Sequence, residues 1–130
     1  MRLQNWPHLL AEYIRARQSV PFTWGSHDCA HFAASAVSAI TGQYPEFPHY
    51  KTKRAALKLL AQKPLRERAG EILGPEIYVS LAQRGDVIMF VDLATGPALG
   101  ICFGENSFFT TTAGLVPVLT LTCLCAWRIT

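Results

Sequence analysis

The spacing of hydrophobic residues divides the chain into a first part with helical periodicity and a second part with strand-like runs. Apolar side chains recur every three or four positions in four segments, which predicts helices over residues 5–17, 29–41, 51–62 and 65–72. One or two further helical turns are expected over 76–83. Short runs rich in β-branched and aromatic residues follow Gly85 and predict strands over 86–91, 98–104, 106–112, 114–120 and 123–129. This order predicts an α+β fold, with N-terminal helices packed on a C-terminal antiparallel sheet of about five or six strands.

Local signals mark the ends of two of these helices. Asn5 is expected to cap the first helix, with Pro7 in its first turn. Asp28 is an N-cap type of residue, and Gly42 suits the position just after a helix C-terminus. Cys29 therefore falls in the first turn of the helix over 29–41, where unpaired N–H groups and the helix dipole favour a thiolate. Cysteine hydrolases use such a thiolate as their nucleophile.

Composition narrows the classes of function. The chain has 130 residues, which predicts one domain, and half of them are hydrophobic while only 16% are charged. We infer from this that a partner covers part of the apolar surface. The net charge of +3 is too small for nucleic-acid binding, since the basic residues gather only between Lys51 and Arg68. No membrane span and no secretory signal are predicted, so we expect synthesis and folding in a cytoplasm.

The cysteines do not predict a metal site or a cofactor. The four are Cys29, Cys102, Cys123 and Cys125, and in a cytosolic chain we expect them to be reduced. Cys123 and Cys125 are two residues apart in a predicted strand, so their side chains should share a face. No second pair has the spacing of zinc ligands, and the His27-x-Cys29-x-His31 cluster is expected to diverge across the helix start.

Three short motifs carry a resemblance to a known family. They are Phe22 to Cys29 (FTWGSHDC), Gly85-Asp86-Val87-Ile88 and Leu99-Gly100-Ile101. They resemble the NlpC-type papain-like cysteine peptidases, and the size of the chain is similar to small phage-encoded, tail-associated members of that family. The resemblance implies a papain-like fold over 1–130 as a single NlpC-like domain, with 43–82 as a helical insertion that flanks the cleft.

The resemblance also implies roles for individual residues. Cys29 would be the nucleophile, supported by Trp24, Gly25, Asp28 and Asp86. Read from the residues alone, Cys29 and Trp24 could instead belong to the core, Asp28 could be only a helix cap, and Asp86 could hold a turn.

One position departs from the family pattern. The general base of the family is the histidine that opens the strand after Gly-Asp, and that position is Ala98 here. Alanine cannot accept a proton from a thiol. His27, in the loop before the helix, and His49, in the Pro-rich linker, are the candidates for a substitute base. The third, orienting polar residue is expected between residues 106 and 112, with Asn106, Ser107 or Thr110 as candidates.

These observations lead to three hypotheses. The first is a cysteine hydrolase that cleaves peptidoglycan peptides through Cys29. The second is a catalytically degenerate member of the family that serves as a structural or assembly protein of a phage tail. Under both hypotheses we expect the protein to be made in the bacterial cytoplasm. Its expected partner is a virion protein or a peptidoglycan peptide. The third is an unrelated α+β binding protein in which Cys29 is part of the core.

Overall fold

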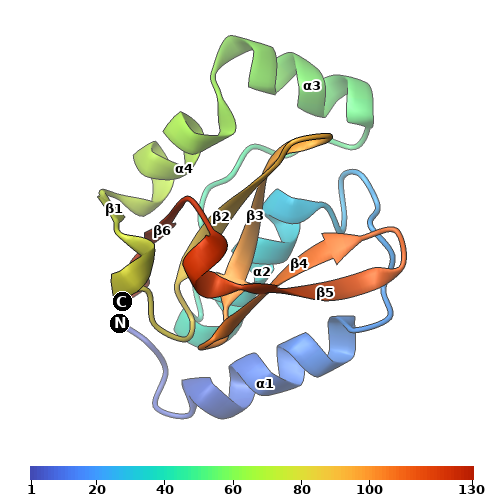
Figure 1. Ribbon diagram of the computed structural model, residues 1–130. Coiled ribbons are helices and arrows are strands. Elements are labelled where there is room, and N and C mark those ends of the chain that lie inside the picture. The colour runs from blue at the N-terminus through green and yellow to red at the C-terminus, as the bar shows by residue number, and fades with distance from the viewer.

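Four α-helices come first in the chain and all six strands follow, as the hydrophobic pattern predicts (Figure 1). The structure is a computed structural model that describes residues 1–130. The helices are α1 (Trp6–Arg17), α2 (Cys29–Thr41), α3 (Lys53–Gln62) and α4 (Leu65–Leu73). The strands are β1 (Glu76–Ile77), β2 (Val87–Asp92), β3 (Gly96–Cys102), β4 (Asn106–Thr111), β5 (Gly114–Leu119) and β6 (Cys125–Trp127). The α+β class is thereby confirmed.

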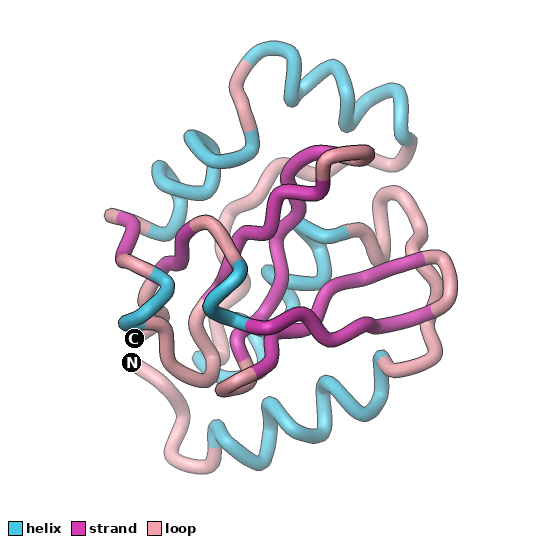
Figure 2. The backbone as a smooth tube through the Cα atoms, in the orientation of Figure 1, coloured by secondary structure: helices cyan, strands magenta, loops and turns pink.

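All six strands join one antiparallel sheet in the order β1-β6-β2-β3-β4-β5 (Figure 2). Strands β3 and β4 pair only through Ile101 with Phe108 and Cys102 with Ser107. Beyond those two pairs the strands diverge, because β4 continues as a hairpin with β5 while β3 stays paired with β2. The sheet therefore opens between β3 and β4 at the end where β3 begins.

Helix α2 packs against β3, and α1 packs on α2 (Figure 1). Small side chains make this approach close, since Ala33 and Ala36 of α2 are fully buried in the same cluster as Leu99 and Ile101 of β3. Burying apolar surface of this kind contributes about 25 cal/mol per Å². The contact fixes the position of the first turn of α2, and hence of Cys29, against the sheet.

The opposite face of the sheet carries a second, smaller cluster built on Ile88, Phe109, Cys123 and Ala126. Gly100 faces this side, and a Cβ atom there would lie 2.3 Å from the carbonyl oxygen of Phe108 and 2.6 Å from the ring of Phe109. A larger residue at position 100 is therefore excluded by contact and not by backbone conformation.

The edge strand β5 is protected against pairing with another chain. The N–H of Leu115 donates to the carbonyl of Gln18 at 3.0 Å. Pro117, two residues on and on the same side of the strand, has no N–H to offer. An edge blocked in this way is a poor template for a further strand.

Three predictions from the sequence need correction. The segment 76–83 forms the short strand β1 and a 3₁₀ turn, η1 (Val79–Leu81), because Glu76 and Ile77 pair with β6. Cys123 and Cys125 do not share a face, since Cys123 ends a turn and packs in the smaller cluster while Cys125 packs in the larger one. Asn5 stands at the start of α1, but its side chain makes no capping hydrogen bond.

The four helices are short. None of them has both the length and the apolar character that crossing a membrane would require.

Candidate functional site

The turn before α2 is held by the buried carboxylate of Asp28. One oxygen accepts from the N–H of His31 at 2.9 Å, which caps the helix, and the other accepts from the N–H of Gly25 at 2.9 Å. Gly25 has φ +85°, and a Cβ atom there would lie 2.8 Å from the backbone of Tyr50 and Lys51. Glycine is required at this position for both reasons. The turn thus brings the segment around Tyr50 against the start of α2.

Cys29, the first residue of α2, lines a cavity of about 710 Å³, which we call the Cys29 cavity. Twelve of its 21 lining residues are hydrophobic. Its walls come from the turn before α2, from α3 and from the first turns of α4. The other lining residues are Phe47, Pro48, Tyr50, Asp92, Thr95, Pro97, Ala98, Thr110, Thr111 and Thr112. Trp24 and Phe22 line it together, with their rings edge to face and their centroids 4.9 Å apart.

The surroundings of Cys29 oppose ionisation of its thiol. Burial raises the pKa of Cys29 to about 11, and the negative charge of Asp28 acts in the same direction. The N–H of Leu99, together with those of Ala30 and of Cys29 itself, faces the sulfur and lowers the pKa, but by less. The expectation that a helix start would favour a thiolate is therefore wrong at this position, because desolvation exceeds the effect of the N–H groups.

Leu99 lies beyond the last pair between β3 and β4, so no residue of β4 pairs with it. Of the backbone N–H groups that lower the pKa of the Cys29 thiol, that of Leu99 has the largest effect.

No histidine lines the Cys29 cavity. His27 is 3% exposed, its ring packs against Phe32 at 5.7 Å, and its Nε2 has no hydrogen-bond partner. Burial lowers the pKa of His27. His49 is exposed and stacks on Tyr44 with ring centroids 6.2 Å apart. Neither candidate for a substitute base is among the residues that line the cavity.

His31 belongs to a separate polar pair. Its Nδ1 lies 2.8 Å from the carboxylate of Asp28, and its ring packs edge to face on Tyr50 at 5.0 Å. His8, on the outer surface of α1, approaches Glu12 at 3.2 Å. None of the four histidines of the chain lines the Cys29 cavity.

The remaining candidates fall in different places. Ala98 lines the cavity and pairs with Phe90 of β2. Asn106 is exposed and pairs with Leu119, and Ser107 is buried with its hydroxyl 2.8 Å from that of Thr120, so neither lines the cavity. Thr110 does line it, and its buried hydroxyl has no hydrogen-bond partner.

Asp86 lies outside the cavity and ties the chain ends together. It is fully buried, and its oxygens accept from Arg2 and Arg128, each at 3.1 Å. They also accept from the N–H of Gln83 at 2.9 Å and of Ile129 at 3.1 Å. The role of Asp86 is to hold a turn and the two termini.

Sequence reasoning missed most of the residues that line the cavity. Tyr50, Lys53 and Arg68 are among them. Burial, followed by the charge of Asp28, raises the pKa of Tyr50, so its hydroxyl stays protonated and is no substitute base. The sequence does show basic residues on the helix predicted over 51–62. Their spacing alone does not show that any of them borders a cavity.

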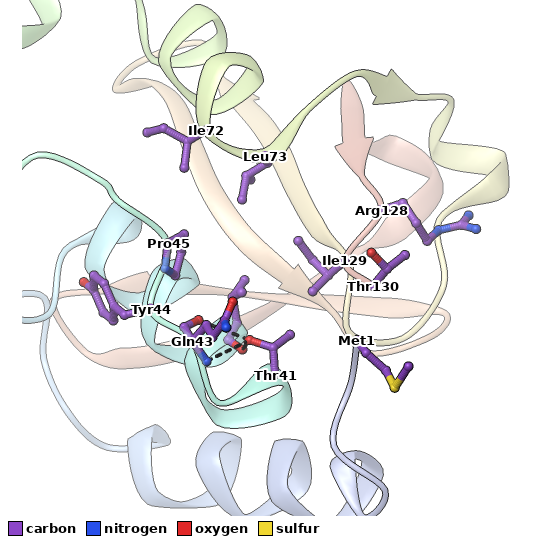
Figure 3. Close-up of a pocket in the computed structure, with 11 residues that line it drawn as sticks. Met1, Thr41, Gln43, Tyr44, Pro45, Ile72, Leu73, Arg128, Ile129 and Thr130 are labelled. Carbon is purple, nitrogen blue, oxygen red and sulfur yellow. Dashed lines mark hydrogen bonds between the residues drawn. The ribbon is translucent and has the colours of Figure 1, made fainter.

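A second pocket, of about 460 Å³, lies away from Cys29 (Figure 3). Thr41 and Gln43 from the end of α2, Ile72 and Leu73 from α4 and the last residues of the chain surround it. It shares no lining residue with the Cys29 cavity. Its side chains include no cysteine, histidine or carboxylate, so it offers no nucleophile or base.

The chain is free of metal-binding clusters and disulfides. No three His, Cys, Asp or Glu side chains come together in a way that could hold a metal ion, and all four cysteines are free thiols.

The fold is that of NlpC/p60 domains. The NlpC/p60 domain of the peptidoglycan hydrolase SagA superposes with a TM-score of 0.60 at 14% identity, covering 94% of this chain and 97% of that domain. RipD from Mycobacterium tuberculosis, described as a non-catalytic NlpC/p60 domain protein adapted to peptidoglycan binding, gives a TM-score of 0.49 at 16% identity, covering 98% of this chain and all of that one. The papain-like fold expected from the motifs is confirmed.

At the level of sequence, no curated protein matches the chain. A family profile matches residues 1–129, almost the whole sequence. The chain belongs to the family described as the domain of unknown function DUF6950.

Proposed function

We propose that this NlpC/p60-fold protein binds a peptide in the Cys29 cavity without hydrolysing it. The observation that carries the proposal is the combination of an open cavity around Cys29 with no histidine among its lining residues. A cysteine hydrolase needs a base within about 2.6–3.2 Å of the atom it deprotonates. Ala98, at the position where the resemblance expects the base, lines the cavity and has no group that could accept a proton.

The raised pKa of Cys29 supports the same conclusion. A thiol with a pKa of about 11 is almost entirely protonated near neutral pH, so it is a poor nucleophile. The cavity nevertheless retains what binding requires, namely a mostly apolar wall with a few polar side chains, among them Lys53 and Thr112. We therefore infer that the nucleophile position now forms part of a binding surface.

Peptides of peptidoglycan are the class of ligand we propose. SagA, whose domain shares the fold, is a peptidoglycan hydrolase. A domain that keeps the cleft but lacks the base would hold such a peptide and release it unchanged.

Binding of muropeptides tests this proposal. The wild-type protein should bind them in isothermal titration calorimetry, and mass spectrometry should recover them intact. Leu57 lines the cavity and is 49% exposed, so Leu57→Gln should weaken binding by about threefold to tenfold without unfolding the protein. Leu93→Gln, at an exposed leucine outside the cavity, is the matched control. Equal affinity in all three proteins, or no binding to the wild type, would contradict the proposal.

An assembly role is a second candidate, favoured by an exposed apolar surface. Between Glu105 and Arg128 no residue is charged, which is unusual for strands and turns that face water. Exposed leucines and a tyrosine gather around two contacting 3₁₀ turns, η1 and η2 (Thr120–Thr122). This surface consists of Tyr78, Leu81, Leu119, Leu121 and Leu124. A phage tail or other virion protein is the partner that we propose for it.

Co-purification tests the assembly role. Leu121 is 73% exposed, so Leu121→Asp should leave the fold intact while placing a charge in the apolar surface. We expect this variant to lose a virion protein that the wild type retains, and Leu93→Asp to keep it. Retention of the partner by both variants would count against the role of this surface.

A further inference from the structure

Three charged side chains line the Cys29 cavity, and two of them are already engaged. Arg68 donates to the carbonyls of Leu59 at 2.6 Å and Lys63 at 3.3 Å, which fixes it against the end of α3. The carboxylate of Asp92 accepts from the N–H groups of Ala94 at 2.7 Å and Thr95 at 3.1 Å, within its own turn. Arg68 and Asp92 are thus both hydrogen-bonded to backbone groups of the protein itself.

Lys53 is different. It is exposed at the start of α3, it lines the cavity, and its ammonium group has no hydrogen-bond or ion-pair partner. An ammonium group beside a mostly apolar cavity is complementary to a ligand that joins an apolar body to an anion.

We propose that the Cys29 cavity takes an apolar ligand that carries a free carboxylate, and that Lys53 binds this carboxylate at the rim. The inference rests on the proposed function, which supplies the apolar body as a peptide and the anion as its C-terminal carboxylate. A fatty acid has the same chemistry, with an acyl chain in place of the peptide. The cavity specifies a ligand that joins an apolar body to a carboxylate, whether that ligand is a peptide or a fatty acid.

Lys58 provides a matched control for Lys53. Both are exposed lysines on α3 without a partner, but Lys58 does not line the cavity. Lys53→Met and Lys58→Met therefore remove the same charge from the same helix, and only the first removes it from the cavity. Neither side chain is buried, so both variants should fold.

The test compares N-acetyl-alanyl-leucine as the free acid and as the carboxamide, by titration calorimetry at low salt. We expect the acid to bind the wild type about fivefold more tightly than the amide. Lys53→Met should abolish that preference and Lys58→Met should keep it. The affinity of the acid should also fall as salt is added, while that of the amide stays constant.

The outcomes separate this inference from the proposed function. Equal binding of acid and amide to the wild type, or the same loss in both lysine variants, overturns the carboxylate inference while peptide binding stands. If neither these peptides nor the muropeptides bind, the proposed function fails, and dodecanoate compared with dodecanol becomes the deciding pair. Binding of dodecanoate that depends on Lys53 then supports the inference with a lipid source, and binding of neither compound overturns it.

Discussion

An Asp86→Asn protein is expected to unfold with a free energy about 3 to 5 kcal/mol below that of the wild type. Asp86 is fully buried and accepts from Arg2 and Arg128, and from the N–H groups of Gln83 and Ile129. The amide removes the negative charge and turns one acceptor into a donor. Arg2, whose side chain is 15% exposed, then loses its counter-ion in a largely buried place. The melting temperature should fall by roughly 10 to 20 °C.

Urea denaturation followed by circular dichroism measures this effect. Glu76→Gln is the matched control, because Glu76 also binds an arginine, Arg66, with contacts of 2.5 and 2.8 Å, but at the surface. Surface pairs of this kind contribute about 1 kcal/mol or less. Equal losses in the two variants would mean that burial of Asp86 is not what stabilises the junction of the two termini.

Local sequence signals predicted the start and end of α2 well. Asp28 caps the helix through its side chain and Gly42 ends it with φ +80°, and both depend only on neighbouring residues. Strand positions were also predictable, because the short runs rich in β-branched and aromatic residues coincide with β2 to β6. The segment 76–83 was not, because its pairing with the distant strand β6 decides its structure.

The chemistry of the site was harder to predict than the fold. A cysteine at a helix start favours a thiolate only if water or positive charge reaches it, and the walls that desolvate Cys29 come from α3 and from hairpins far along the chain. The direction of the His27 side chain follows from its turn, in which its N–H donates to the carbonyl of Thr23 at 2.8 Å while the ring packs on Phe32. Neither the burial of Cys29 nor the orientation of the His27 side chain can be predicted from the spacing of residues in the sequence.

The second large effect expected is in the reactivity of Cys29. The rise in pKa from 9.0 to about 11 lowers the fraction of thiolate near neutral pH by about 100-fold relative to an unperturbed cysteine. Because the thiolate is the species that reacts, alkylation of Cys29 should be slow at pH 7 and should accelerate about tenfold for each pH unit up to pH 10. Limited access alone would lower the rate equally at every pH, so the shape of the profile isolates the pKa.

The rate of iodoacetamide alkylation at Cys29 as a function of pH, resolved by peptide mass spectrometry, is the most direct test of a cleft that binds without reacting. We expect a log-linear rise through neutral pH with no plateau below about pH 10. A plateau reached between pH 6 and 8 would reveal an activated thiolate, and would mean that a base or a cation serves Cys29 after all.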